Sequence, residues 1–342
     1  MAFFSIGGVR IAGVCGAVPQ LEEAVASLDI FTSSEAAHFT ATTGVRSRHV
    51  SAKLLASDLC TAAAKRMMDS LAWEPSTIDA LVAVTQTPDH FRPSNAHLLH
   101  RCLGLSKECA AICISAGCSG WVYGLHSAAS HIATGARRVL LCCGEGVTAY
   151  DPRDKSTYPL FGAAGTCTAL EAVPAAAPMH FHLASDGAGW NAIRIPSGAY
   201  RDPSGERKAV EMDGMSVFSF GITEPPKSIK ALLARHAIDP SSIDSLLLHQ
   251  ANLMLNAKIA KKSGFAPERC PHNIEDFGNS SSATIPLLMA TRLKMPLETS
   301  RRKLLACAFG VGLSWGSVYF ETDKIAVPDL VFVEDGYADV FA

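Results

Sequence analysis

The sequence predicts an α/β fold made of two duplicated halves, each a mixed β-sheet covered by helices. Two pairs of similar segments within the sequence, called echoes below, support this prediction. Residues 74–84 (Glu-Pro-Ser-Thr-Ile-Asp-Ala-Leu-Val-Ala-Val) resemble residues 239–249 (Asp-Pro-Ser-Ser-Ile-Asp-Ser-Leu-Leu-Leu-His). Residues 137–143 resemble residues 301–307, in the same order and at almost the same offset. One such match arises easily by chance, but two in register indicate a repeated unit.

Helical stripes precede both copies of the first echo, and apolar strands follow them. The stripes consist of Leu59, Ala63, Met67 and Leu71, and of Ile229, Leu232 and Leu233. Between the halves lies an Ala- and Pro-rich stretch, 173–178, which is too short for a free linker. We therefore expect residues 1–172 and 173–342 to form two halves that pack tightly together. Residues 1–19 predict a first core strand. The tail, 322–342, predicts an extended strap on the body.

Composition and charge narrow the class of protein. Of 342 residues, 48% are hydrophobic and 18% charged, which is typical of a compact enzyme. The net charge of -2 excludes a general attraction to nucleic acid or anionic membranes. No charge-free apolar run is long enough to span a bilayer, and we find no convincing secretory signal, so we expect a cytoplasmic protein. Eleven cysteines without a C-x-x-C pair argue against a metal site and disulfides.

Cys118 lies in Cys-Ile-Ser-Ala-Gly-Cys-Ser-Gly, residues 113–120. Residues 110–114 predict a buried strand, and apolar residues recur at helical spacing from Trp121 to Ile132. We therefore expect Cys118 at a helix N-terminus, where backbone N–H groups and the helix dipole lower the pKa of a thiol. On this segment alone, an inert buried cysteine is as good an interpretation as a nucleophile.

Three further segments hold candidate catalytic groups. His249 ends the second repeated strand, where the first repeat has Val84, and α/β active sites gather at such strand ends. Most single histidines nevertheless serve only the core. Asn279 lies in a turn rich in Gly and Ser, where asparagine commonly serves only the turn. The glycines of 309–316 either expose N–H groups to an oxyanion or form a β-bulge.

Together these segments resemble the β-ketoacyl-acyl carrier protein synthase III family of the thiolase fold, along nearly the whole chain. The motifs are Thr43–Arg48, Thr87–Asp89 with Pro93-Ser94, the turn at Cys118, His249–Asn252, Gly278–Ser280 and Gly310–Gly316. Each motif is weak alone, but their order and separations are specific. An asparagine as third catalytic residue also fits this branch of the fold. The resemblance implies a thiolase-like fold whose halves pack as a layered αβαβα sandwich.

The resemblance implies a decarboxylating Claisen condensation that needs no metal or other cofactor. Cys118 attacks a starter acyl thioester of coenzyme A or acyl carrier protein and retains the acyl group. Backbone N–H groups of Cys118 and Val311 stabilise the oxyanion. A malonyl thioester on the carrier protein then loses carbon dioxide while His249 and Asn279 donate hydrogen bonds to its thioester oxygen. Its carbanion attacks acyl-Cys118, in fatty-acid synthesis or a specialised acyl pathway.

The resemblance also implies substrate-binding and docking residues. Those around the substrate are Phe91, Arg92, Met212, Met215, Phe218, Gly310 and Gly312. A basic patch on the helix after His249 would dock the acidic carrier protein, although lysines on a helix are more often only a solvated face. The patch consists of Lys258, Lys261 and Lys262. A homodimer is implied as well, in which the loop Thr87–Ser94 reaches the neighbour's tunnel.

The chain departs from the family pattern at three places. Residues 161–165 are Phe-Gly-Ala-Ala-Gly where Phe-Gly-Asp-Gly is usual, so this loop lacks a carboxylate anchor. His38 and Thr42 stand where many members clamp the adenine of coenzyme A with Trp and Arg, which favours weaker binding of coenzyme A or another acyl donor. Val311 replaces a glycine but keeps its backbone N–H.

Three other functions stay open at this point. The same fold can pass an acyl group from Cys118 to an alcohol or amine without condensation, and release of carbon dioxide from a malonyl thioester separates the two reactions. A non-catalytic partner subunit is disfavoured because all three catalytic candidates are intact. A nucleotide-binding α/β protein lacks support, since the sequence has neither a G-x-G-x-x-G nor a P-loop signature.

Overall fold

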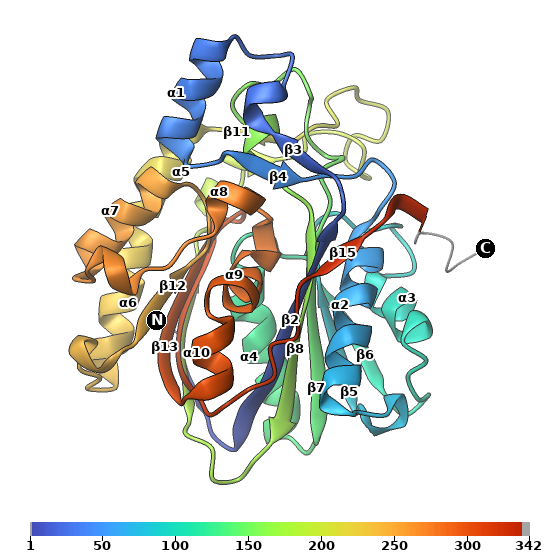
Figure 1. Ribbon diagram of the computed structural model, residues 1–342, viewed down its shortest axis with the longest axis vertical. Helices are drawn as coiled ribbons and strands as arrows, with labels where there is room; N and C mark the ends of the chain where they lie inside the picture. The colour runs from blue at the N-terminus through green and yellow to red at the C-terminus, as the bar shows by residue number, and fades with distance from the viewer. Residues whose placement is uncertain (1, 337–342) are drawn as a thin grey trace.

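The computed structural model describes residues 2–336 and contains two mixed β-sheets in a five-layered arrangement of helices and sheets (Figure 1). The strands of the first sheet, in spatial order, are β15 (Val331–Val333), β2 (Val9–Pro19), β8 (Ala164–Ala172), β7 (Arg138–Glu145), β5 (Ala80–Val84) and β6 (Ala110–Ile114). Those of the second sheet are β1 (Ala2–Ile6), β9 (Met179–Ser185), β14 (Ser314–Thr322), β13 (Arg302–Gly310) and β12 (Ser245–Leu248).

Helices fill the space between the sheets and cover their outer faces. The middle layer is α4 (Gly120–Ala133) and α9 (Thr284–Arg292), which contact both sheets. The outer layers are α2 (Ala56–Leu71) with α3 (Asn95–Cys102), and α6 (Glu224–Arg235) with α7 (Leu253–Ser263). The predicted αβαβα layering is confirmed. Across residues 2–336, no helix combines the length and apolar character needed to cross a membrane.

Smaller elements complete the fold at the ends of the sheets. Two short ribbons pair β3 with β4 and β10 with β11. Their bounds, with those of the remaining helices, are β3 (Glu22–Ala24), β4 (Ser47–His49), β10 (Ile193–Arg194), β11 (Glu211–Met212), α1 (Ser33–Thr43), α5 (Gly214–Gly221), α8 (Ile274–Phe277) and α10 (Lys294–Thr299).

The predicted duplication is confirmed, and a repeated hydrogen bond explains part of the echo. β5 and β12 occupy equivalent places beside β7 and β13. In the first half the Asp79 carboxylate accepts hydrogen bonds from the backbone N–H groups of Arg137 and Arg138, at 2.6 and 3.1 Å. In the second half Asp244 accepts one from the N–H of Lys303 at 2.7 Å. The repeated aspartate therefore fixes the start of the neighbouring parallel strand in each sheet.

The two ends of the chain are exchanged between the halves. The chain passes from the first sheet to the second over residues 173–178, between β8 and β9. β1 pairs with β9 in the second sheet, and β15 pairs with β2 in the first. Neither residues 1–172 nor residues 173–342 therefore contain a complete sheet. The prediction of one core strand over 1–19 is wrong, because the chain changes sheets at Gly8, whose φ of +75° glycine adopts without strain.

The strand that leads to Cys118 also differs from its prediction. Residues 110–114 form β6 as expected, but this strand lies at the edge of the first sheet and is only partly buried. Ile112, for example, is 37% exposed. Apolar composition alone cannot separate a central strand from an edge strand with an uncovered face.

The tail forms the predicted strap as far as it is described. Ile325 and Val327 are buried against the body, and β15 extends the first sheet. The hydroxyl of Ser51 donates a hydrogen bond to Asp335 at 2.7 Å. Residues 337–342 of the predicted strap lie outside the described residues.

A buried arginine from the motif at 43–48 anchors the loop around residues 158–165. The side chain of Arg48 is fully buried, pairs with Glu23 at 2.6 Å and donates to the carbonyl oxygen of Phe161 at 2.8 Å. It also donates to the carbonyl of Tyr158. The loop that lacks the usual carboxylate is thus anchored through its carbonyl groups.

We predict that Arg48→Met lowers the free energy of unfolding by about 3 kcal/mol, because two backbone carbonyls lose their donor in a buried place. Arg46→Met is the matched control, since Arg46 pairs with Asp276 through a side chain that is 65% exposed and should change stability by less than about 1 kcal/mol. Urea denaturation measures both. Equal effects of the two substitutions would contradict the anchoring role of Arg48.

Candidate active site

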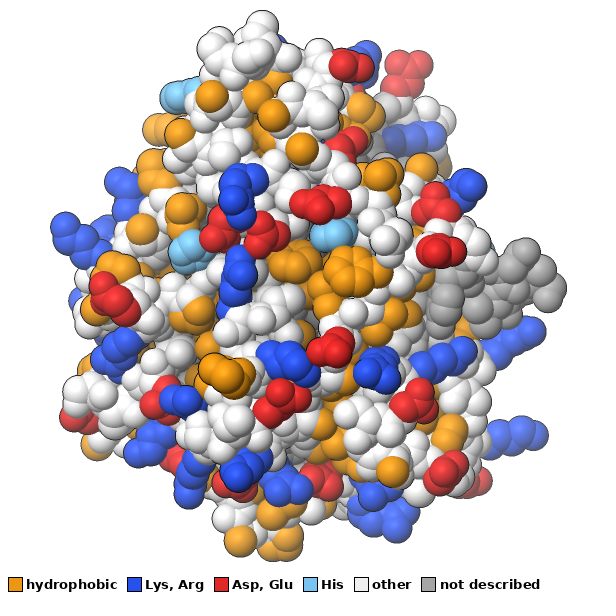
Figure 2. Space-filling view, in the orientation of Figure 1, with side chains coloured by type: hydrophobic (Ala, Val, Ile, Leu, Met, Phe, Trp, Pro, Cys, Tyr) orange, Lys and Arg blue, Asp and Glu red, His pale blue; other side chains and the backbone are white. Residues whose placement is uncertain are grey.

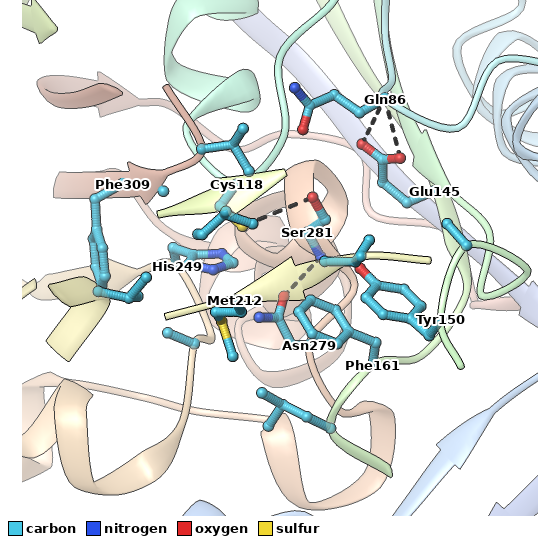
Figure 3. A pocket seen from close by; sticks show the side chains of 18 of the residues that line it. Gln86, Cys118, Glu145, Tyr150, Phe161, Met212, His249, Asn279, Ser281 and Phe309 are labelled. Atoms are coloured by element: carbon cyan, nitrogen blue, oxygen red, sulfur yellow. Dashed lines mark hydrogen bonds between the residues drawn. The ribbon is translucent and has the colours of Figure 1, made fainter. Parts of the chain in front are cut away.

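A cavity of about 460 Å³ opens where the two halves meet, and its walls are mostly apolar. Cys118 comes from the first half, while His249 and Asn279 come from the second, and all three line this cavity. In Figure 3 their side chains converge on one space, beside Phe309 and Met212. The structure therefore brings together the three residues that the sequence singled out as catalytic candidates.

Cys118 lies on a turn between β6 and α4, one residue before the N-cap residue Ser119. The turn fits closely against the end of β13. A Cβ atom added to Gly310 would lie 2.6 Å from the Cβ and 3.0 Å from the Sγ of Cys118, so only glycine is tolerated there. The hydroxyls of Ser119 and Ser314 hydrogen-bond at 2.6 Å across the same junction.

The expected lowering of the thiol pKa is wrong for the free protein. Burial raises the pKa of Cys118 to about 12, and the nearby carboxyl group of Glu145 also raises it. Hydrogen bonds from Ser281, whose Oγ lies 3.8 Å from the sulfur, offset only part of this effect. The helix N-terminus cannot compensate for removal of the thiolate from water. The thiol is therefore protonated at neutral pH and needs a base when it attacks.

His249 directly follows β12, as predicted, and is 1% exposed. Its Nδ1 lies 2.8 Å from the hydroxyl oxygen of Thr284, at the start of α9. Burial lowers the pKa of His249 to about 3. The imidazole is consequently neutral over the physiological range and is able to accept a proton only transiently.

Asn279 is held by its backbone and by one side-chain hydrogen bond. Its N–H donates to the carbonyl of Leu160 at 2.8 Å, and its own carbonyl accepts from the N–H of Gly162 at 3.1 Å. The side-chain oxygen accepts from the N–H of Ser281 at 2.8 Å. Because that oxygen is already engaged, the amide nitrogen is the group left to donate to a ligand in the cavity.

Three residues near the site, Ser281, Thr284 and Glu145, escaped the sequence analysis. Ser281 touches both Cys118 and Asn279, and Thr284 contacts His249. The sequence pattern around Ser281 indicated only a turn rich in Gly and Ser. Glu145, buried at the end of β7, accepts hydrogen bonds from the N–H of Gln86 at 3.1 Å and the hydroxyl of Ser282 at 3.3 Å. Burial raises the pKa of this carboxyl to about 7.

The predicted substrate residues fall into three groups. Met212, Phe218 and Gly310 line the cavity, as does Val311, the predicted oxyanion donor. Phe91 and Arg92 line an adjoining hollow of about 950 Å³, whose wall shares Gln86, Thr87, Ala149 and Ile195 with the cavity. Met215 lies on the surface, 83% exposed, and Gly312 lies in the turn after β13 with a φ of +141°.

The three lysines of α7 are exposed, but they face different neighbours. The ammonium of Lys258 lies 5.4 Å from the ring centre of Phe218, a cavity residue. Lys262 donates to the carbonyl of Ile222 at 2.9 Å. Lys261 instead lines a separate cavity of about 530 Å³ beside Phe265. Figure 2 shows basic side chains along the left edge of the molecule, over α7.

A thiol, an imidazole and a carboxamide at the junction of two duplicated α/β halves define a class of protein, the condensing enzymes of the thiolase fold. Comparisons with known proteins narrow this class. Residues 113–187 match the family model described as 3-oxoacyl-[acyl-carrier-protein (ACP)] synthase III, and residues 233–322 match its C-terminal model.

Relatives of known name agree with the family models. A β-ketoacyl-[acyl-carrier-protein] synthase III of Pseudomonas aeruginosa is 34% identical over 326 residues, which cover 92% of this chain and 98% of the relative. One of Streptococcus pneumoniae is 34% identical over 285 residues, covering 81% and 87%. The crystal structure of a 3-oxoacyl-(acyl-carrier protein) synthase from Burkholderia xenovorans superposes with a TM-score of 0.94 at 36% identity, covering 97% and 99%.

The chain belongs to the 3-oxoacyl-[acyl-carrier-protein] synthase III family. It is an enzyme of the β-ketoacyl-acyl carrier protein synthase III type, and the thiolase-like fold is confirmed.

We predict that alkylation of Cys118 by iodoacetamide accelerates about tenfold for each unit of pH between 6 and 9, without a plateau. The thiolate is the reactive form, and its fraction rises tenfold per pH unit below a raised pKa. Mass spectrometry of peptides is needed, because Cys102, Cys113 and Cys270 are also partly exposed. A constant rate at neutral pH would instead reveal a thiolate paired with an imidazolium.

Proposed function

We propose that this chain condenses an acyl thioester with a malonyl thioester of acyl carrier protein, by decarboxylation and through an acyl-Cys118 intermediate. The observation that carries the proposal is the cavity in which Cys118, His249 and Asn279 meet, with the Asn279 amide nitrogen free to donate. The names of the relatives give the same reaction type. In class the enzyme is an acyltransferase, of fatty-acid or specialised acyl biosynthesis.

The first half-reaction moves the acyl group to the enzyme. The Sγ of Cys118 attacks the thioester carbonyl, its proton passes to the Nε2 of His249, and the same proton then leaves on the departing thiol. Backbone N–H groups of Cys118 and Val311 are the donors for the tetrahedral oxyanion. A base is required because burial raises the pKa of Cys118 to about 12.

The second half-reaction forms the carbon–carbon bond. The malonyl thioester loses carbon dioxide, and the electron pair of the broken bond becomes an enolate. Hydrogen bonds from Asn279 and His249 to the thioester oxygen stabilise this charge, each contributing on the order of 3 kcal/mol. The enolate carbon attacks the acyl group, and Cys118 leaves as a thiolate that regains a proton. Neither half-reaction requires a metal or a redox cofactor.

The surface that would bind the adenine of an acyl-coenzyme A donor differs from that of many relatives. Where many relatives clamp adenine, His38 and Thr42 line a hollow together with Phe31. Lys155 pairs with Glu35 at 2.7 Å beside this hollow. The residues that line the hollow include no arginine that could stack on an adenine ring. These residues favour a donor recognised chiefly through its pantetheine arm, which coenzyme A and acyl carrier protein share.

We also propose a cytoplasmic homodimer. All eleven cysteines are free thiols, as a reducing compartment maintains them. Phe91 and Tyr200, 73% and 78% exposed, form an apolar surface beside the hollow that adjoins the cavity. Within residues 2–336, no strand pairs with the outer edge of β6. Exposed apolar surfaces and open edges of this kind commonly bind a partner chain. Sedimentation equilibrium should give twice the chain mass of 36.2 kDa, and a single-chain mass would contradict the dimer.

Intact-mass spectrometry tests the chemistry. Offered a panel of acyl thioesters, the wild-type protein should gain one acyl mass and Cys118→Ala none; labelling of the alanine variant would exclude this nucleophile. Asn279→Ala should lower the release of carbon dioxide from malonyl carrier protein by roughly a hundredfold, the usual effect of losing one preorganised donor, with self-acylation largely retained. Acyl transfer to an alcohol or amine without carbon dioxide release would identify the enzyme as a simple transferase.

Charge reversal tests the docking of the carrier protein. Lys258→Glu should raise the KM for malonyl carrier protein roughly fivefold at unchanged kcat, which corresponds to about 1 kcal/mol of docking energy at the cavity mouth. Lys261→Glu is the matched control on the same helix, because Lys261 faces the separate cavity. Indistinguishable KM values for the two variants would remove this surface from the docking site.

A further inference from the structure

A single hydroxyl group lies between the catalytic imidazole and a backbone carbonyl. The Oγ1 of Thr284 is 2.8 Å from the Nδ1 of His249 and 3.0 Å from the carbonyl oxygen of Ser281. Thr284 is 2% exposed, so its hydroxyl is shielded from solvent and these two atoms are the partners to which it can donate. Both distances are normal for hydrogen bonds.

The hydroxyl has one hydrogen, and its direction decides the tautomer of His249. When the hydroxyl donates to the carbonyl of Ser281, its oxygen accepts from Nδ1–H, and Nε2 is left with a lone pair. When the hydroxyl donates to Nδ1, that nitrogen has no hydrogen, and Nε2 carries it. Thr284 is therefore compatible with either tautomer, and each is fixed by a complete set of hydrogen bonds.

The two half-reactions need opposite tautomers. Removal of the proton from the Cys118 thiol requires an Nε2 with a free lone pair. Stabilisation of the malonyl enolate requires an Nε2–H that donates to the thioester oxygen. Because burial lowers the pKa of His249 to about 3, an imidazolium with both hydrogens is disfavoured as a resting state. A neutral ring serves both steps only if it changes tautomer between them.

We propose that Thr284 is a positioning residue whose hydroxyl turns between the carbonyl of Ser281 and the Nδ1 of His249, allowing one neutral imidazole to act as base and then as hydrogen-bond donor. The proposal rests on the proposed function. The number of protons on the ring is the same before and after the change, because one proton leaves Nδ1 for bulk solvent and one proton from solvent binds Nε2. No other reactant is required.

Removal of the hydroxyl should affect the two half-reactions unequally. In Thr284→Val the Nδ1–H of His249 still has the carbonyl of Ser281 within reach, which fixes the tautomer with a bare Nε2. Self-acylation should then fall less than threefold, while release of carbon dioxide from malonyl carrier protein should fall roughly a hundredfold. Thr284→Ser should restore both rates, because it keeps the hydroxyl.

Thr291→Val is the matched control, since it removes a hydroxyl from the same helix that bonds the carbonyl of Leu287 at 2.7 Å, away from the cavity. Its two rates should match the wild type. Equal losses in both half-reactions of Thr284→Val, or unimpaired carbon dioxide release, would overturn the role of Thr284. If the wild type itself neither becomes acylated nor releases carbon dioxide, the proposed function fails instead.

Nitrogen-15 NMR of the His249 ring gives a readout that does not depend on the stability of any variant. The free wild-type enzyme should show the Nδ1–H tautomer. The acylated enzyme with a non-decarboxylating malonyl thioester analogue should show the Nε2–H tautomer. The same tautomer in both states would overturn the proposal, whatever the kinetics of the variants.

Discussion

The close contact between the end of β13 and the nucleophile turn is the constraint on which the site depends. Gly310 has no side chain, so the second half lies directly against Cys118. The Ser119–Ser314 hydrogen bond holds the same junction. In the middle layer, the thiol turn leads into α4, and the turn before α9 presents Ser281, which contacts the thiol. Thr284, the first residue of α9, contacts the imidazole. A duplicated fold thus creates one asymmetric site at the junction of its halves. The first half contributes the thiol, and the second contributes the imidazole and the carboxamide.

Burial at that seam determines the charge states of the groups. A thiol and an imidazole that are both withdrawn from water are both neutral, since each loses more from desolvation than it gains from its neighbours. Because neither group is charged at rest, the site must stabilise charge through hydrogen bonds that form as the reaction proceeds. The carboxamide of Asn279 and the hydroxyls of Ser281 and Thr284 supply such bonds. The backbone of Ser281 holds the oxygen of the Asn279 carboxamide and lies within hydrogen-bond distance of the Thr284 hydroxyl.

Local patterns revealed the fold and the three central residues, but not the interactions among distant segments. The echoes at 74–84 and 239–249 predicted equivalent strands because the repeated aspartate has the same backbone task twice. The serines at 280–282 indicated only a turn, since nothing in the local sequence shows that Cys118 and Glu145 lie across from them. The exposed edge at β6 and the break at Gly8 likewise depend on which strands become neighbours. The raised thiol pKa follows from burial, which no helix N-terminus reveals.

The exchange of the terminal strands between the sheets has a consequence for the order in which the protein assembles. The strand β1 has no partner until β9 has been made, and β2 lacks one flanking strand until β15 has been made. Pairings between such distant positions are slow to form. Neither half can therefore complete its sheet by itself during synthesis, and the nucleophile reaches its final surroundings only when both halves have been made.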